Sequence, residues 1–133
     1  MPVTTPRPIL SSPADLPTPV GYSHVVTVPP GRLVWTSGQV GLSTEGTAAQ
    51  GWEGQTRQAF DNVGRALAAA GASWSDVVKL TIYVVSVDEL ATVRAVRDEF
   101  VDPSAPPTSS LVQVAGLFRP ELLIEVEAVA FLP

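Results

Sequence analysis

The sequence predicts an α+β fold in which two helices cover one face of a mixed β-sheet. Apolar residues alternate at every second position in several short segments and recur at helical spacing in two longer ones. These segments follow one another in the order ββαβαββ, without an internal repeat of roughly 20 to 50 residues. At 133 residues, the chain is long enough to bury the core of one domain.

The first 20 residues are predicted to form an extended arm. Prolines stand at positions 2, 6, 8, 13, 17 and 19, and each proline fixes φ and removes a backbone donor. We therefore expect a Pro-rich arm without a packed element over residues 1–20, followed by a single domain over residues 21–133. The arm lacks the continuous apolar core of an export signal.

Two strands are predicted at the start of the domain. Residues 23–28 (SHVVTV) and 32–38 (RLVWTSG) are rich in strand-forming residues. The Pro-Pro-Gly sequence between them suits a hairpin turn, so we expect the two strands to pair with each other. The next stretch, residues 41–51, is turn-like and has room for one further short strand.

Two helices follow. The first is expected to begin at Trp52, where the apolar period becomes helical, and to end at Gly71, a residue typical of a C-terminal cap. The second follows Ser86–Glu89, which has capping-box spacing, and ends before the Pro-rich residues 102–107. Their positions are marked by Phe60, Val63, Leu67 and Ala70 in the first helix and by Leu90, Val93, Arg97 and Phe100 in the second.

Three more strands are predicted over residues 75–85, 109–117 and 122–131. Strict alternation in the first of these places Val78, Leu80, Ile82 and Val84 on the face that the helices cover. In the last strand, Ile124 and Val126 share that face.

Glu125 and Glu127 then point to the opposite face, together with Tyr83, Val129 and Phe131. No helix is left to cover this face, so we expect another subunit to cover it. A carboxylate in such a seam costs several kcal/mol unless it is paired, and it therefore needs a partner or a function. For Glu127, a solvated edge position is the alternative.

The composition narrows the classes of partner. The net charge is -5 and the few basic residues form no stripe, so we expect no nucleic-acid partner. The chain has no Cys and only one His, His24, which is too few for a histidine or thiolate metal site. No apolar run reaches the roughly 20 residues of a membrane span. We expect a soluble, cytoplasmic protein, and its low charged fraction of 16% suggests self-association.

Five motifs occur in order along the chain: WTSGQVG (35–41), QTRQAFDNVGRALAAAGAS (55–73), VVKLTIYV (77–84), PPTSSLVQVA (106–115) and IEVEAVA (124–130). Together they resemble the RidA/YjgF family of reactive-intermediate imine deaminases, from about residue 21 to residue 131. The resemblance implies a chorismate-mutase-like subunit that assembles as a homotrimer with small-molecule clefts between subunits. It also implies hydrolysis of imines or enamines to keto acids and ammonia, without a metal or organic cofactor.

The resemblance assigns roles to individual residues. Glu125 matches the glutamate that holds the attacking water, and Ser37 and Gly38 match a stretch that lines the pocket; a strand ending in a turn is the alternative for these two residues. Ser109 stands where the family has an arginine that grips the substrate carboxylate. A serine hydroxyl replaces a bidentate guanidinium here, so most of that anchoring is expected to be lost.

Two further assignments stay open. The family has a tyrosine in the pocket upstream of the TSG stretch. An alignment from TSG without a gap places this tyrosine at His24, whereas a small shift of the alignment places it at Tyr22. Arg94 stands where the family has a pocket asparagine, and it could supply a cationic anchor for the substrate from another wall of the cleft. The alternative is an exposed ion pair between Arg94 and Asp98.

We therefore expect a hydrolase of imines or related C=N compounds, with Glu125 as the base and an altered specificity. A trimeric ligand-binding or chaperone-like module without turnover is the alternative. Ribonuclease activity fits poorly with an acidic chain that has a single histidine. Chorismate mutase activity would need several cations in the cleft, because its substrate is a dianion.

Overall fold

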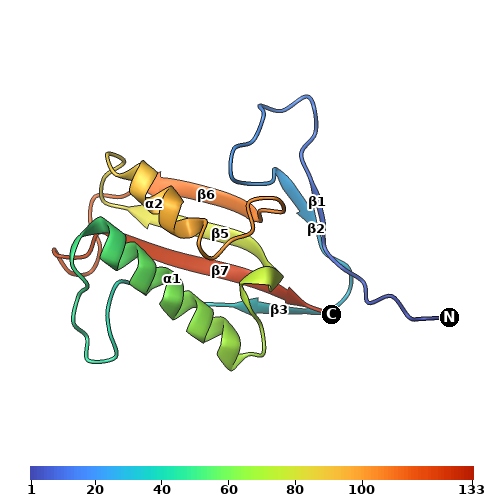
Figure 1. The fold of residues 1–133 in the computed structure, drawn as a ribbon, viewed down its shortest axis with the longest axis horizontal. Coiled ribbons are helices and arrows are strands. Elements are labelled where there is room, and N and C mark those ends of the chain that lie inside the picture. Colours follow the sequence, from blue (N-terminus) through green and yellow to red (C-terminus); the bar gives the residue numbers. More distant parts are fainter.

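The computed structural model describes residues 1–133 and has the predicted α+β architecture (Figure 1). Two α-helices and a short 3-10 helix pack on one face of a mixed sheet. In chain order, the elements are β1 (Ile9–Ser11), β2 (Val25–Thr27), β3 (Arg32–Trp35), β4 (Gln39–Val40), α1 (Gly51–Ala69), η1 (Trp74–Asp76), β5 (Val77–Val84), α2 (Leu90–Arg97), β6 (Thr108–Gln113) and β7 (Ile124–Leu132).

The main sheet has five strands, in the order β3-β7-β5-β6, with β4 also paired to β7. Strand β7 lies at its centre and pairs antiparallel with β3, β4 and β5, whereas β5 and β6 run parallel. The β5–α2–β6 connection is therefore a crossover, which places α2 on the same face as α1 (Figure 1). The predicted mixed sheet with helices on one face is confirmed.

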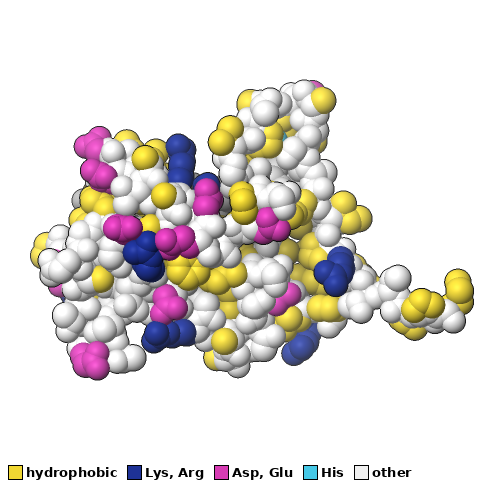
Figure 2. Space-filling model, viewed as in Figure 1, with side chains coloured by type: hydrophobic (Ala, Val, Ile, Leu, Met, Phe, Trp, Pro, Cys, Tyr) yellow, Lys and Arg dark blue, Asp and Glu magenta, His cyan; other side chains and the backbone are white.

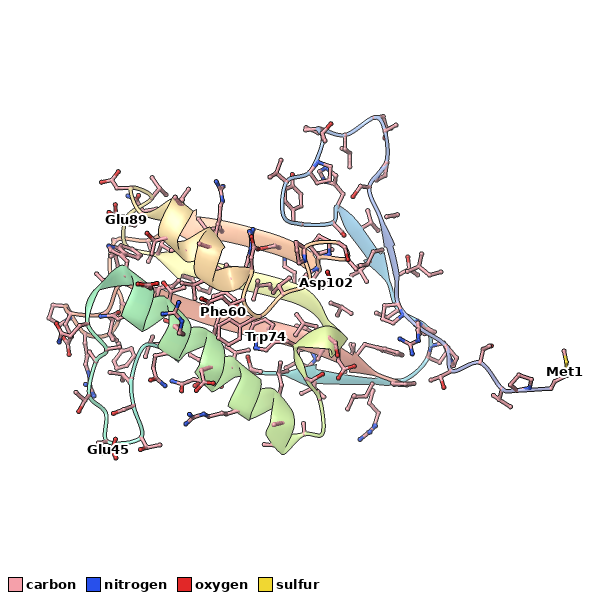
Figure 3. All side chains as sticks on the ribbon, in the orientation of Figure 1. Met1, Glu45, Phe60, Trp74, Glu89 and Asp102 are labelled. Carbon is pink, nitrogen blue, oxygen red and sulfur yellow. The ribbon has the colours of Figure 1, made fainter.

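The core lies between the helices and this face of the sheet. Phe60 of α1 is fully buried and stacks on Trp74 at 5.2 Å between ring centroids, with Phe100 5.5 Å away. Figure 3 shows Phe60 and Trp74 between α1 and the strands. Fully enclosed aliphatic side chains come from both layers, among them Val63, Leu67, Val84, Ile124, Val126 and Ala130.

One prediction on the sheet face is wrong at Val78. A β-bulge shifts the register between Val77 and Lys79, so Val77 stands opposite Ala130 and packs in the core. Val78 is buried as well, but it lines a cavity with Pro6, Pro8 and Phe131 beneath the N-terminal arm. The strict alternation assumed from the sequence holds only from Lys79 onward.

The helix ends differ in how well the sequence predicts them. Gly71 has φ of 79° and follows the last turn of α1, as expected of a glycine cap. The capping box expected at Ser86–Glu89 is wrong, because α2 begins after Glu89 without a side-chain cap. A capping box forms instead at Ser73, which begins η1. Helix α2 ends at Arg97, before Phe100.

The predicted hairpin is also wrong. Strand β2 pairs with β1, and β3 pairs with β7, so the Pro-Pro-Gly segment carries the chain from one sheet to the other. Two consecutive residues without an N–H cannot continue a ladder, which separates the strands on either side. The expectation of an arm without packed elements is wrong at Ile9–Ser11, which form β1.

The β1–β2 ribbon projects from the main body, and hydrophobic side chains gather on it and on the arm (Figure 2). Several of these side chains are exposed, among them Ile9, Leu16, Val20 and Val25. None of the helices combines the length and the apolar character that crossing a bilayer requires.

Candidate functional site

Glu125 lies near the start of β7, on the sheet face that carries no helix. It stands opposite Tyr83 of β5 and Val40 of β4, and its side chain is half-buried. Its neighbours in sequence, Ile124 and Val126, are fully buried on the helix side. Alternation along β7 therefore presents the carboxylate on the open face, as predicted from the sequence.

Gly38 lies directly against the Glu125 carboxylate. The Thr36–Gly38 segment separates β3 from β4: Thr36 donates its N–H to the carbonyl of Ala128 (3.0 Å), and its Oγ1 accepts the Ala128 N–H (3.1 Å). A Cβ atom on residue 38 would overlap Oε1 of Glu125, so only glycine leaves the carboxylate in this position. Ser37, in contrast, is exposed and its hydroxyl has no partner in the chain.

Two polar side chains of α1 hold the strands that carry these residues. The buried Gln55 donates to the carbonyl of Glu121 and accepts the N–H of Leu123, both at 2.8 Å. Asn62 donates to the carbonyls of Val40 (3.1 Å) and Leu42 (2.9 Å). Helix α1 thus holds the residues just before β7 and those at the end of β4, which lie on either side of Glu125.

Tyr83 and Glu127 complete this open face beside Glu125. The Tyr83 hydroxyl donates to Oε1 of Glu127 at 2.6 Å. This hydrogen bond raises the pKa of Tyr83, and burial and the negative charges of Glu127 and Glu125 raise it further. Glu127 is therefore paired, not a free edge residue. We call Gly38, Tyr83, Glu125 and Glu127 the glutamate surface.

A second group of predicted residues gathers where the chain enters β6. Ser23 donates its N–H to the carbonyl of Pro107 (3.0 Å) and its hydroxyl to that of Pro106 (2.6 Å). These bonds hold Tyr22 and His24 beside β6, and the two rings pack edge-on at 5.2 Å. The His24 Nε2–H donates to the carbonyl of Pro17 at 2.6 Å, which orients the imidazole within the β1–β2 ribbon segment.

Ser109 is half-buried on β6, opposite Leu80 of β5. Because paired residues on parallel strands share a face, its side chain points to the helix side, like Leu111. Arg94 is exposed on α2, and the alternative pair with Asp98 does not form, since the Asp98 carboxylate accepts from Arg97. We call Tyr22, His24, Arg94, Arg97 and Ser109 the serine surface.

The two surfaces do not meet within one chain. Ser109 is level with Leu80 and faces the helices, whereas Glu125 is level with Tyr83, three residues further along β5, and faces away from them. No sequence motif indicated a role for Tyr83 or Arg97. Alternation indicated the face of Tyr83, but its bond to Glu127 depends on the pairing register, which the sequence does not reveal.

Comparisons with known proteins agree with this fold. The family model described as Endoribonuclease L-PSP matches residues 14–132. A 2-iminobutanoate/2-iminopropanoate deaminase of Salmonella typhimurium is 35% identical over 119 residues, covering 87% of this chain and 91% of the relative. RutC family protein slr0709 of Synechocystis is 33% identical over 124 residues, covering 90% and 93%.

Solved structures are similar as well. YyfB of Yersinia pestis, from the conserved Rid protein family, superposes with a TM-score of 0.86 at 36% identity, over 95% of this chain and 99% of that one. Escherichia coli TdcF, solved with bound serine, gives a TM-score of 0.72 at 32% identity, over 92% and 94%. This chain therefore belongs to the RidA/YjgF family, which the family model names Endoribonuclease L-PSP.

Proposed function

We propose that this protein hydrolyses an imine, an enamine or a related C=N compound with a water molecule held by Glu125. Water adds to the imine carbon, the C–N bond then breaks, and the products are a carbonyl compound and ammonia. The carboxylate of Glu125 takes a proton from the attacking water and can return it to the departing nitrogen, so no net proton is consumed.

The contact between Gly38 and Glu125 is the observation that carries this proposal. A carboxylate on an open sheet face would ordinarily be free to adopt many rotamers. Here the Gly38 backbone lies against it and α1 fixes both flanking strands through Gln55 and Asn62. A positioned carboxylate is what a general base requires, because proton transfer needs hydrogen-bond distance and defined geometry.

The proposed site lies between subunits of a homotrimer. The glutamate surface and the serine surface face opposite ways in one chain, so a cleft that contains both needs two copies. The open face also exposes Trp35 (73%) and Leu33 (48%), a large apolar area that a second subunit would cover. Light scattering at micromolar concentration is expected to give three times the 14.0 kDa chain mass; a monomeric mass would remove the cleft.

Ser109 is proposed to alter the specificity. It offers one neutral hydroxyl on a short side chain, whereas a guanidinium at this position would form two charge-assisted hydrogen bonds, worth about 1.5 to 3 kcal/mol each. Small imino acids such as 2-iminopropionate should therefore be poor substrates. The family relation to 2-iminobutanoate/2-iminopropanoate deaminases supports the reaction type. On this proposal, Ser109 moves the specificity of this chain away from that substrate class.

The test follows ketone formation from a panel of imines generated in situ from amino acids and from amines without a carboxylate. We expect the wild type to accelerate at least one imine, and Glu125→Gln to lower that rate by about 10²-fold or more. Ser109→Arg is expected to raise hydrolysis of 2-iminopropionate by roughly tenfold or more. Unchanged turnover in Glu125→Gln would sink the proposed mechanism.

A ligand-binding module without turnover is the second candidate. Ser109, without a guanidinium, favours it, and so does the structure of TdcF, which holds serine. On this alternative, the wild type binds small carboxylates or amino acids but accelerates no imine in the panel. Binding that is equal in the wild type and in Glu125→Gln, with no turnover in either protein, would identify it.

A further inference from the structure

A cavity of about 390 Å³ lies between the N-terminal arm and one end of the main sheet. Its walls come mainly from the arm (residues 5–8 and Leu10), from the junction of η1 and β5 (residues 75–78) and from the end of β7 (Phe131 and Pro133). This volume is typical of sites that bind small organic molecules. No residue of the glutamate surface or the serine surface lines the cavity, and Glu125 precedes Phe131 by six residues along β7, which spans about 20 Å in a strand.

The floor of this cavity consists of two large apolar side chains that backbone features hold in place. The β-bulge between Val77 and Lys79 directs Val78 into the cavity, where it is only 6% exposed. Phe131 is 3% exposed, and a Cβ atom on residue 31 would overlap its ring, so only glycine at that position leaves the ring where it is. Bulges that redirect a side chain are frequent beside active sites. The floor is therefore built into the folded chain.

The arm closes the cavity from the other side. Pro6, Pro8 and Leu10 supply its apolar wall, and the two prolines fix φ on either side of Arg7. Directly after them, Ile9–Ser11 pair with β2, which attaches the arm to the ribbon. Figure 1 shows the arm running past the end of β7 before it enters β1. The wall is therefore a stiff, extended segment that β1 holds at one end.

Arg7 is the one cationic side chain that lines the cavity, and it has no partner in the chain. The ion pairs of the chain engage other arginines: Arg57, Arg65, Arg97 and Arg119. Asp76 is the one carboxylate side chain in the lining, and its Oδ2 accepts both the N–H of Ser73 (2.9 Å) and the Ser73 hydroxyl (3.3 Å) in the capping box. The cavity thus combines an apolar floor with an unpaired, exposed guanidinium.

We propose that this cavity binds a small amphipathic anion, a molecule with an apolar aromatic or alkyl body and one anionic group. The body leaves water when it lies against Val78, Phe131 and the prolines of the arm. The anionic group meets Arg7, whose guanidinium offers parallel N–H donors to a carboxylate, sulfonate or phosphate. The net charge of -5 repels anions in general, so an anion needs a local cation such as this one. The site is independent of the proposed hydrolysis and lies apart from Glu125.

Isothermal titration tests the charge requirement with naphthalene-2-sulfonate and octanoate, which carry an aromatic and an alkyl body, and with their uncharged amides. We expect at least one of the two anions to bind the wild type about fivefold more tightly than its amide, as an exposed ion pair predicts. This preference should fall below about twofold in Arg7→Gln and persist in the surface control Arg65→Gln. The tighter of the two anions identifies the preferred body.

The apolar wall is tested on two neighbouring residues of β1. Leu10→Ala removes part of the wall and should weaken binding of the same anion about threefold or more. Ile9→Ala is the matched control, because Ile9 is 67% exposed and does not line the cavity. Binding to this variant should equal that to the wild type.

Four results overturn the proposal: no binding of either anion, no preference over the amide, a preference that survives Arg7→Gln, or equal weakening in Leu10→Ala and Ile9→Ala. Binding that is lost in Glu125→Gln would place the anion in the proposed cleft and overturns the proposal as well. If a variant does not fold, methyl NMR of the wild type decides. The Val78 methyl signals must then shift with the anion, and the lack of a shift counts against the site.

Discussion

The Tyr83 hydroxyl donates a 2.6 Å hydrogen bond to Glu127, across the central strand pair β5–β7 and beside Glu125. Two carboxylates two residues apart on one strand share a face, and the phenol holds one of them. Glu127 is therefore engaged within the chain, while the oxygens of Glu125 make no hydrogen bond to the protein and are available to a ligand.

Tyr83 should ionise above the ordinary tyrosine value of 10.0, because its proton is shared with a carboxylate. A pKa that is raised in the folded state stabilises the protein below the unfolded value, and this contribution is lost as the pH rises through the folded pKa. Ultraviolet titration should show a late phenolate component that is absent in Tyr83→Phe and shifts toward lower pH in Glu127→Gln. An unshifted component in Glu127→Gln would contradict the pairing.

Gly38→Ala should separate activity from stability. The new Cβ would occupy the place of Oε1 of Glu125, the mobile end of a long side chain, so the carboxylate can swing away at little cost to folding. We expect unfolding free energy to change by less than about 1 kcal/mol, while turnover falls as far as in Glu125→Gln. The matched control is Gly54→Ala in α1, where a Cβ atom meets only Ala49 at 3.6 Å. Retained activity in Gly38→Ala would remove the proposed positioning.

Phe60→Ala should be among the most destabilising substitutions. The ring is fully buried between Trp74 and Phe100, and removing it leaves a cavity that the two remaining rings cannot fill. Truncation of a buried phenylalanine costs about 3 to 5 kcal/mol. Denaturant unfolding measures the loss, and Phe60→Leu, which keeps most of the volume, should lose clearly less. Equal stability of the wild type and Phe60→Ala would contradict this description of the core.

Acid should weaken the link between α1 and the turn that follows α2. Arg57 of α1 donates to both Glu99 oxygens, at 2.9 and 2.7 Å, and these bonds lower the pKa of Glu99 below 4.5. The resulting stabilisation is present above the unfolded pKa and is lost as the pH falls through the folded value. Between about pH 5 and pH 3, the wild type should therefore lose more stability than Glu99→Gln. Parallel pH profiles of the two proteins would show that the pair contributes nothing measurable.

The predictions that succeeded concern single segments. Helix α1 and its Gly71 cap follow from a helical apolar period and from the left-handed conformation that glycine tolerates. The shared face of Glu125 and Glu127 follows from the alternation of any strand, and the family followed from motifs in order along the chain. Each of these features follows from segments taken one at a time, without knowledge of which segments pair.

The predictions that failed needed partners that are distant in sequence. Strand β2 pairs with β1 and not with β3, and a bulge moves Val77 into the core in place of Val78. Strand pairing is a choice among edges with similar hydrogen-bonding capacity, and only the packing of the whole chain decides it.

The candidate site divides in the same way. The sequence by itself determined the architecture, the carboxylate on an open sheet face and the serine at position 109. Only the tertiary structure placed Gly38 against Glu125, Tyr83 on Glu127 and Arg97 on Gly21. The face on which a side chain lies follows from the backbone geometry of its own strand or helix. These contacts, in contrast, depend on where separate segments of the chain pack together.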